Sequence, residues 1–530
     1  MLESGPLVRV VTSAEATARD RAAIDAGVPS RALMQRAGAA TASEIALRFH
    51  DRLNSGVLVY AGPGNNGGDA WVVARALAAS GIRVRVAEVV PAATPDARAE
   101  RALAVPFIER ATHGGGESLD GGSPGRGERL VIDGMLGTGS SGAPRDEIGR
   151  ALAGIRPMRE RGVAVVALDI PTGVDATTGQ VHVGARADVT FTYGTLKRGH
   201  LIARAACGRI VVLDIGLGAH AELDDGAPWM VSGSWVARRV PDIRVDAHKG
   251  SRKKLAIVGG GDGMSGAPIL AARAAWHSGV GMVKLVVSRE SLDAARRSEP
   301  RSLTAAWPAS EADVERDIAR WADVVAIGPG LGAGGEAREL VERVLHGFGG
   351  PVVLDADAIN IFSSDVNALA KLLKGRPAVL TPHPMEFGRL TGTGVDEVLA
   401  RRFEVALPLA KHTQAVVLLK GQPTIVTSPG GQRWVSASGT PLLAAAGSGD
   451  LLTGMVGTLL AQMGDPHAAA ACATWVHGRA AWLVHRDGSS PRGWTLDDVI
   501  ARLPRAWAVR ARHSRYPVLL ELPDLASRRR

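Results

Sequence analysis

The sequence predicts an α/β protein of two domains, each organised around a mainly parallel sheet. Length is the first reason, because 530 residues exceed what one hydrophobic core usually organises. The second reason is the alternation of short apolar runs, rich in valine, isoleucine and leucine, with alanine-rich helical stretches. The third is that glycine-rich loops follow many of these runs, as they do where a parallel strand ends and a helix begins.

The composition excludes several other classes of protein. No apolar run reaches the roughly 18 residues of a membrane-spanning helix, and the first residues lack the pattern of a secretory signal. Two cysteines are too few for a disulfide framework. The formal charge of +9 comes from scattered arginines, without a basic stripe rich in aromatic residues. We therefore expect a cytoplasmic protein that binds neither membrane nor nucleic acid, and whose basic balance suits anionic small molecules.

The first domain opens with an alanine-rich helical region up to about residue 48, and a strand follows at residues 56–60. The strand enters the loop 61–70, Ala-Gly-Pro-Gly-Asn-Asn-Gly-Gly-Asp-Ala, and we expect the next helix to begin at Trp71. A glycine loop between a strand and a helix is a common setting for phosphate or nucleotide binding. The two asparagines and Asp69 add oxygen atoms that could hold a ligand or a hard cation. A plain glycine turn is the alternative.

Two later strands of this domain end in aspartate. Asp133 follows the apolar run 130–132 and precedes a second glycine loop, while Asp169 follows the run 163–168 and precedes Pro-Thr-Gly. In open parallel sheets, ligands bind at the carboxyl ends of the strands. Three such ends with Asn or Asp are expected to converge on one binding site.

These motifs resemble the NAD(P)H-hydrate epimerase family, also called the YjeF N-terminal domain, over about residues 10–220. The resemblance implies a Rossmann-like three-layer α/β/α fold over residues 1–225. It implies that the hydrated nicotinamide dinucleotide is bound by Asn65, Asn66, Gly67, Gly68, Asp69, Gly137, Thr138, Gly139, Ser140, Ser141, Gly142, Ala143 and Asp169. It also implies that K⁺ is ligated by Asn66, Asp133 and Thr172. We expect Asp133 to be catalytic, because epimerising a carbinolamine carbon needs a carboxylate that gives and takes a proton.

The second domain, predicted over residues 226–530, repeats the strand–loop–helix pattern. Each strand is a nearly continuous apolar run, as in a sheet buried on both faces, so a doubly wound α/β domain is expected. The predicted strands lie at 255–258, 323–327, 351–354, 378–381 and 415–419. Residues after about 490, with segments around Pro504, Pro517 and Pro523 and an arginine-rich end, are expected on the surface.

The stretch 439–455 carries the strongest signal for chemistry in this half. Gly447 and Gly449 allow a sharp turn with bare N–H groups, and the following helix directs its positive end to the same place. Such a loop suits a phosphoryl group in transfer. Asp450, at the helix start, could accept a proton from a substrate hydroxyl. The alternative is a glycine turn with Asp450 as a plain N-cap.

This half resembles the ADP/ATP-dependent NAD(P)H-hydrate dehydratase family, a branch of the ribokinase-like fold, over about residues 245–490. The resemblance implies that the adenine nucleotide is bound by Lys420, Gly421, Gln422, Pro423, Thr424 and Gly449. It implies that the hydrate is bound by Ala267, Gly330, His383 and Asp450. Met385, Ala446 and Ser448 depart from the residues usual in the family, whereas the glycines, His383 and Asp450 are kept.

The expected function is a two-step repair of nicotinamide nucleotides. The first domain would interconvert the R and S hydrates. In the second, Asp450 would deprotonate the carbinol hydroxyl as it attacks the terminal phosphoryl group of ADP, and the ring nitrogen would then expel phosphate, leaving AMP. We expect Mg²⁺ in this step and a homo-oligomeric protein. Two alternatives stay open: a ribokinase-like kinase of a small alcohol with a non-catalytic N-terminal binding domain, and a first domain that has kept only its fold.

Overall fold

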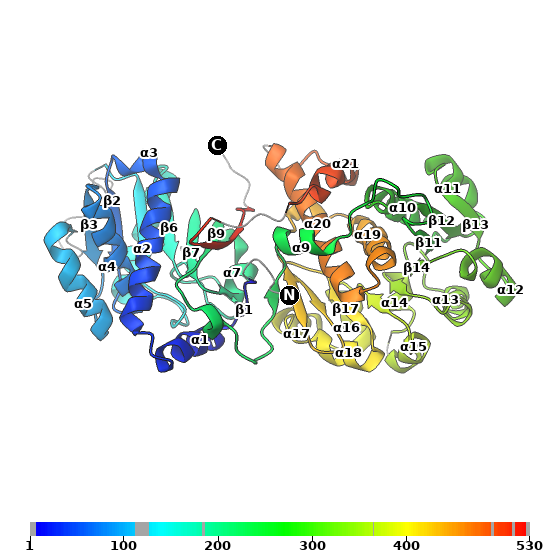
Figure 1. Ribbon diagram of the computed structural model, residues 1–530, viewed down its shortest axis with the longest axis horizontal. Helices are drawn as coiled ribbons and strands as arrows, with labels where there is room; N and C mark the ends of the chain where they lie inside the picture. Colours follow the sequence, from blue (N-terminus) through cyan, green and yellow to red (C-terminus); the bar gives the residue numbers. More distant parts are fainter. Residues whose placement is uncertain are drawn as a thin grey trace. The chain divides into compact units, whose positions relative to one another are not determined.

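The computed structural model describes residues 7–111, 127–182, 186–363, 365–488, 492–510 and 515–525. The chain forms two compact units (Figure 1), and it passes from the first to the second between Ala227 and Pro228. The described residues 515–525 return to the first unit. Within the described chain, the first unit contains a sheet of eight strands and the second a sheet of ten. In these same ranges, no helix has both the length and the apolar character that crossing a membrane requires.

The sheet of the first unit has the order β20-β9-β7-β6-β5-β2-β3-β4 and is parallel except for β20. Alternate residues of the central strands face opposite sides. Val57 and Val59 pack in one cluster with α2 and α4, whereas Leu58 and Tyr60 pack in another with α6. The predicted three-layer α/β/α architecture is therefore confirmed. The strands are β2 (Val57–Ala61), β3 (Val84–Glu88), β4 (Glu109–Ala111), β5 (Leu130–Gly134), β6 (Ala164–Leu168), β7 (Val189–Tyr193), β9 (Arg209–Leu213) and β20 (Val518–Leu522).

The helices of the first unit begin where the sequence supplies caps. Thr12 and Glu15 form a capping box at the start of α1, and a break at residues 26–29 separates α1 from α2. A short pair, β1 (Val10–Val11) with β8 (Leu196–Lys197), joins the N-terminal segment to the chain after β7. The helices are α1 (Ser13–Asp25), α2 (Ser30–Arg48), α3 (His50–Leu53), α4 (Asn65–Ala79), α5 (Pro95–Ala104), α6 (Asp146–Glu160), α7 (Arg198–Ile202) and α8 (Arg204–Cys207).

The start of α4 corrects one prediction. The helix begins at Asn65, so residues 65–70 of the predicted glycine loop are helical. Close packing explains the glycines there. A Cβ on Gly67 would lie 1.9 Å from the Gly62 carbonyl oxygen, and one on Gly68 would lie 2.4 Å from Met34 Cε. The glycines thus bring the helix against the preceding strand end and α2, and the positive end of α4 lies at the site.

The C-terminal segment corrects a second prediction, because part of it is neither second-domain structure nor plain surface. Residues of β20 pair antiparallel with β9 and cover the edge of the first sheet. Glu521 of this strand forms ion pairs with Arg48 at 2.9 Å and with Arg209 at 2.5 Å. Pro517 precedes the strand, where a missing N–H costs little. The outer backbone groups of β9 are thereby paired, and β20 becomes the edge strand.

The sheet of the second unit has the order β10-β19-β18-β17-β16-β15-β14-β11-β12-β13. It is parallel from β13 to β17, and β18 is antiparallel to both of its neighbours. Each of the five predicted apolar runs coincides with a strand. The strands are β10 (Trp229–Met230), β11 (Lys254–Val258), β12 (Met282–Val287), β13 (Leu303–Ala306), β14 (Val324–Ile327), β15 (Val352–Leu354), β16 (Ala378–Leu380), β17 (Val416–Leu419), β18 (Thr424–Thr427) and β19 (Arg433–Ser436).

Helices cover both faces of this second sheet, which confirms the doubly wound fold. Residues of α13, α15, α16 and α18 join alternate strand residues in one large buried cluster. Helix α19 packs against both α10 and α20, and it also lies against β11 and β14. The helices are α9 (Gly233–Arg239), α10 (Gly266–His277), α11 (Leu292–Ser298), α12 (Glu311–Val314), α13 (Gly335–Gly347), α14 (Asp357–Asn360), α15 (Val366–Leu373), α16 (Pro384–Thr391), α17 (Val395–Ala400), α18 (Ala406–Thr413), α19 (Ser448–Met463), α20 (Pro466–Asp487) and α21 (Leu496–Trp507).

Candidate functional sites

The candidate site of the first unit lies at the carboxyl ends of the adjacent strands β2, β5 and β6. Asn66 lies in the first turn of α4 after β2, Asp133 is the last residue but one of β5, and Asp169 directly follows β6. These strands are neighbours in the sheet, so the three side chains are brought to one edge. The predicted convergence of the three strand ends is therefore present.

Asp133 is held by a closed set of hydrogen bonds. Its Oδ1 accepts from the Thr172 hydroxyl at 2.7 Å and from the Met135 N–H at 3.2 Å, and its Oδ2 accepts from the Thr172 N–H at 2.9 Å. The residue is 3% exposed. Burial raises the pKa of Asp133, and the hydrogen bonds from Thr172 and Met135 act against that rise. The prediction that Asp133 transfers a proton stays a prediction.

Asn66 supplies the feature of this corner that suits a cation. Its amide nitrogen donates to the Leu136 carbonyl at 2.9 Å, and its buried Oδ1 has no hydrogen-bond partner within the described ranges. A buried acceptor without a donor is costly unless something else satisfies it. The amide oxygen of Asn66, the carboxylate of Asp133 and the hydroxyl of Thr172 are ligand types that hard cations such as K⁺ accept. The residues predicted to hold K⁺ therefore fit it.

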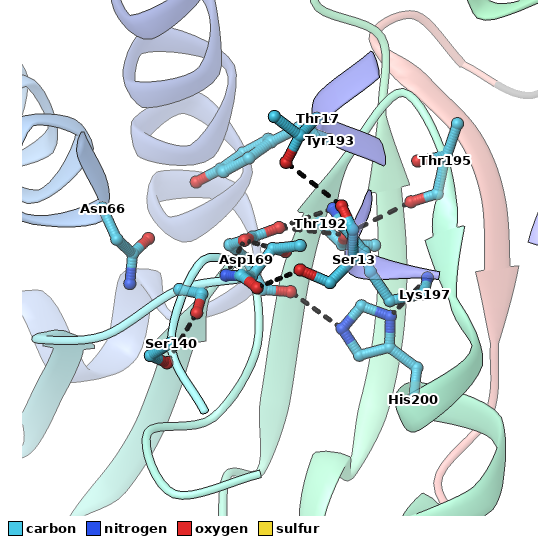
Figure 2. Close-up of polar contacts among 12 residues, drawn as sticks. Ser13, Thr17, Asn66, Ser140, Asp169, Thr192, Tyr193, Thr195, Lys197 and His200 are labelled. Atoms are coloured by element: carbon cyan, nitrogen blue, oxygen red, sulfur yellow. Dashed lines mark hydrogen bonds and ion pairs between the residues drawn. The ribbon is translucent and has the colours of Figure 1, made fainter. Parts of the chain in front are cut away.

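Asp169 is the most strongly bound carboxylate of the site. Its Oδ2 accepts from the N–H of Thr138 at 2.8 Å and from the hydroxyl of Thr138 at 2.5 Å. Its Oδ1 lies 2.6 Å from Nζ of Lys197, which comes from β8 (Figure 2). The backbone of Asp169 is left-handed, with φ of +60°, a strained conformation for a residue with a side chain.

His200 supports this arrangement through the backbone. Its Nδ1 accepts from the Lys197 N–H at 3.1 Å, and its Nε2 lies 2.8 Å from the carbonyl oxygen of Asp169. Nε2 therefore carries the proton in the neutral ring. Burial and the Lys197 charge lower the pKa of His200 to about 3, so the ring stays neutral at physiological pH. One imidazole thus links the backbones of the two charged residues.

The carboxylates of this site are unequal in acidity. Burial acts to raise the pKa of Asp169, but the charge and hydrogen bond of Lys197, with the hydrogen bonds from Thr138, lower it to about 2. Burial raises the pKa of Asp69 well above its ordinary value, and the charges of Asp169 and Asp20 add to that rise. Burial likewise raises the pKa of Asp20, against the charge of Lys197. One ammonium among three carboxylates leaves Asp169 as the one that is readily ionised.

The remaining predicted residues of the first site form its loops. Gly137 is pressed between two functional side chains, since a Cβ there would lie 3.1 Å from both Asn66 Cβ and Asp169 Oδ2. Ser140 donates to the Gly137 carbonyl at 2.8 Å and folds the loop back. The exposed positions of the predicted set are Asn65, Gly139, Ser141, Gly142 and Ala143. They are placed to meet a ligand that approaches from solvent.

The candidate site of the second unit is built on a buried ion pair at the ends of β15 and β17. Nζ of Lys420 lies 2.8 Å from Asp355 Oδ1. The same carboxylate accepts from the hydroxyls of Thr381 and Thr453, each at 2.7 Å. Burial acts to raise the pKa of Asp355, but Lys420 and the two hydroxyls lower it. The charged pair therefore persists at neutral pH.

Asp450 lies in the first turn of α19, where the prediction placed it. Gly447 before it has φ of +92°, and a Cβ on Gly449 would lie 3.3 Å from Nζ of Lys420. The glycines thus turn the chain and keep the helix N-terminus open toward the lysine. Burial and the charge of Asp355 raise the pKa of Asp450 to about 7, despite the opposing charge of Lys420. A carboxylate with this pKa is matched to proton exchange near neutrality.

His383 and Glu386 flank the same lysine. His383 caps α16 through Nδ1, which accepts from the N–H groups of Met385 at 3.1 Å and Glu386 at 3.3 Å. Its Nε2 lies 3.2 Å from Glu386 Oε1, and the His383 side chain is 41% exposed. The other oxygen of Glu386 lies 3.7 Å from Nζ of Lys420. Both ring nitrogens of His383 are therefore held by contacts with α16, while the exposed part of the ring is open to a ligand.

The other predicted residues of this half line two loops. A Cβ on Gly330 would lie 3.1 Å from Ala267 Cβ, so these two predicted hydrate contacts are adjacent. In the loop from β17 to β18, Gly421 and Thr424 are tied together, because the Thr424 hydroxyl donates to the Gly421 carbonyl at 2.8 Å. A Cβ on Gly439 would lie 3.1 Å from Gln422 Oε1, which places the loop predicted to bind the nucleotide beside the start of the 439–455 stretch.

Three charged residues of these sites were not singled out from the sequence. Lys197 follows the carboxyl end of β7, Asp355 follows that of β15, and Glu386 is in the capping box of α16. The strand-end rule that selected Asp133 and Asp169 applies equally to Asp355, whereas Lys197 lies in the short strand β8 and only the fold brings it to Asp169. Glu386 carries no comparable signal, since a capping box predicts only a helix start.

Comparisons with known proteins follow the same division of the chain. Residues 30–199 match the family model described as YjeF-related protein N-terminus, and residues 255–505 match the one described as NAD(P)H-hydrate dehydratase. The Nnr proteins called bifunctional NAD(P)H-hydrate repair enzymes are relatives over both units. The protein from Moorella thermoacetica is 33% identical over 89% of this chain and 91% of its own length. The protein from Salinibacter ruber is 34% identical over 94% of this chain and 96% of its own length. A crystal structure of the ADP/ATP-dependent NAD(P)H-hydrate dehydratase from Bacillus subtilis, co-crystallized with ATP/Mg²⁺, is 31% identical. It covers 52% of this chain and 96% of its own, with a TM-score of 0.47.

Proposed function

We infer, because the chain belongs to the family of bifunctional NAD(P)H-hydrate repair enzymes, that its two units carry out successive steps of one repair. The first unit interconverts the R and S hydrates of NADH or NADPH. The second removes water from the S hydrate at the expense of ADP, giving AMP and phosphate. Together the two steps recover the reduced nucleotide from either epimer.

The observation that carries the dehydratase proposal is the position of Asp450. The residue stands at the N-terminus of α19, and Gly449 lies against the ammonium of Lys420. A base beside a helix N-terminus and a lysine can deprotonate a hydroxyl while the transferring phosphoryl group is stabilised. The S hydrate supplies that hydroxyl, and its ring nitrogen then expels phosphate, a far better leaving group than hydroxide.

The nucleotide and ions belong to this proposal. We assign the adenine nucleotide to the loop 420–424 and Gly449, and the hydrate to Ala267, Gly330, His383 and Asp450. Within the described ranges, no group of three or more His, Cys, Asp or Glu side chains is arranged to hold a metal ion. We expect Mg²⁺ to be bound largely through the phosphates of ADP, as is usual for Mg²⁺ in phosphoryl transfer.

In the first unit, we assign K⁺ to Asn66, Asp133 and Thr172, where it would supply fixed positive charge. We assign the hydrate to Asp169 and to the loops 65–69 and 137–143. Asn66 Oδ1 supports the ion, as it is a buried acceptor that would otherwise go unsatisfied. A homo-oligomeric state remains a further proposal.

To test this, an equal mixture of the R and S hydrates of NADH is incubated with the purified protein, with and without ADP. Reduced-nicotinamide absorbance, AMP and phosphate are followed together. Full recovery of NADH with one AMP and one phosphate per molecule supports both activities. Recovery that stops at half removes the epimerase from the proposal. The kinase of a small alcohol is not favoured, since the relatives that match both units are repair enzymes; persistence of a phosphorylated hydrate would revive it.

A further inference from the structure

A buried lysine lies in the first site, and the proposed function gives it no role. The side chain of Lys197 is 4% exposed, and its Nζ lies 2.6 Å from Asp169 Oδ1 and 2.9 Å from Thr192 Oγ1. Figure 2 shows it pointing from β8 toward Asp169. Removing an ammonium from water is costly, so a lysine this buried is kept only with charged or polar partners. Its partner here is a residue of the site.

The surroundings of Asp169 hold its carboxylate in the ionised form. Lys197 and Thr138 direct donors at both oxygens, and a carboxylate that only accepts is an ionised one. His200 and the left-handed backbone fix the residue between β6 and α7. The carboxylate also faces the ligand loop, because a Cβ on Gly137 would lie 3.1 Å from Asp169 Oδ2.

Asp133 is less suited to exchange a proton with a substrate. Hydrogen bonds occupy both oxygens of Asp133 and both oxygens of Asp169, so the two carboxylates differ in access rather than in occupancy, and Asp133 is only 3% exposed. The Asp169 side chain is 13% exposed, so it remains within reach of a ligand. Access thus favours Asp169.

We propose that Asp169, positioned and held ionised by Lys197, is the proton acceptor of the epimerase site, and that Asp69 is the proton donor. This assignment rests on the proposed epimerase function. Asp69 lies one helical turn after Asn66 on α4, so it projects from the face that borders Gly137. Lys197 is a positioning residue, since it acts through Asp169.

The exchange opens and closes the ring of the hydrate. The carbinol O–H bond breaks and its proton passes to Asp169. The bond from that carbon to the ring nitrogen breaks as the C=O bond forms, and its electron pair stays on nitrogen, which takes the proton of Asp69. Rotation of the aldehyde and the reverse steps close the ring on the other face. Both carboxyl groups return to their starting states, and nothing is oxidised or reduced.

The charges around Asp169 support this division of roles. Lys197 faces it from β8, neutral His200 from α7, Asp69 from α4 and Asp20 from α1. Tyr193 faces it from β7, and burial raises the pKa of this phenol, so it stays neutral. Burial and the charges of Asp169 and Asp20 raise the pKa of Asp69, which therefore keeps its proton. Two carboxyl groups whose acidities are driven apart are suited to serve as an acid and a base.

The test is the conversion of purified R hydrate to S hydrate by Lys197→Met and Lys197→Arg. We expect Lys197→Met to lose at least about 100-fold in rate at pH 6, the usual scale for a displaced general base. Without the ammonium, burial raises the pKa of Asp169, so the variant should regain activity as the pH rises to 8. The epimerisation rate of the wild type should not change over the same pH range. Lys197→Arg should keep the flat profile. Dehydration of S hydrate by the second unit of the same molecules should be unchanged.

Arg85→Met is the matched control, because Arg85 also faces a buried carboxylate in the first unit, Glu128 at 3.1 Å, outside the site. It should keep the epimerase rate. If Lys197→Met melts early, Asp169→Asn gives a second test, and loss of interconversion is expected there too. If the wild type is active, the assignment of Asp169 is overturned by either of two results: Lys197→Met keeps the wild-type rate and pH profile, or Asp169→Asn is active. Either result leaves the proposed epimerase function standing. A wild type that never interconverts the hydrates overturns the proposed epimerase as well.

Discussion

Replacing Asp450 with asparagine should abolish dehydration and yet stabilise the second unit above neutral pH. The pKa of Asp450 is raised from 3.8 to about 7 by burial and by the charge of Asp355. About half of this carboxylate is ionised at pH 7 and about a tenth at pH 6, so the dehydration rate should rise roughly tenfold between pH 6 and pH 8. The neutral variant should show no such rise, because it has no base.

The same shift fixes the sign of the stability effect. The pKa of Asp450 is higher in the folded state than in the unfolded state, so the contribution of the protonated carboxyl group to the free energy of unfolding is complete below about pH 4. This contribution is lost as the pH rises through 7. At about 1.4 kcal/mol per pKa unit, ionised Asp450 costs the wild type up to about 4 kcal/mol, less whatever solvent relaxation recovers. Asp450→Asn should therefore match the wild type at pH 4 and be about 2–4 kcal/mol more stable at pH 8.

Urea unfolding at pH 4 and pH 8 measures the stability difference, and a pH series of NADH recovery from S hydrate measures the rate. A control variant, Asp497→Asn, removes an exposed carboxylate from the same unit and should change neither the stability difference nor the rate. A flat wild-type rate between pH 6 and pH 8, or an active Asp450→Asn, would refute the role of Asp450 as the base.

Three further predictions concern other parts of the two sites. Lys420→Met should lower the free energy of unfolding by about 3 kcal/mol and abolish ADP binding, because it leaves Asp355 buried and unpaired; urea unfolding and ADP titration test this, and an intact ADP affinity contradicts it. Gly67→Ala should lower the free energy of unfolding by at least about 2 kcal/mol and slow epimerisation, since its Cβ would lie 1.9 Å from the Gly62 carbonyl oxygen. A variant as stable as the wild type by thermal melting would show that α4 can move. Replacing K⁺ with choline should slow epimerisation, and Asn66→Leu should remove the K⁺ dependence; an equal rate in both salts argues against the ion.

The architecture was predictable because buried parallel strands leave a simple mark on the sequence. The runs 255–258 and 351–354 are apolar throughout, as both faces of their sheet are covered by helices. Asp133, Asp169 and Asp450 were found for a related reason: they stand at strand ends or at a helix start, where the ligands of α/β proteins bind.

What could not be predicted depends on contacts between distant parts of the chain. The pairing of β20 with β9 joins residues about 300 positions apart, and the apolar run 518–520 alone does not indicate which sheet it enters. Lys197 is an ordinary lysine in the sequence, and only the fold places it against Asp169. The glycines of Gly67–Gly68 were read as a loop, whereas close packing within a helix requires them.

The most direct test of the whole account follows purified R hydrate, free of the S form, with ADP and two proteins, the wild type and Asp450→Asn. The wild type should convert all R hydrate to NADH, with one phosphate released for each molecule. The variant should convert R hydrate into a mixture of R and S and release neither NADH nor phosphate. R hydrate that remains unchanged with both proteins, while S hydrate is recovered by the wild type, would contradict the claim that the two units act in succession.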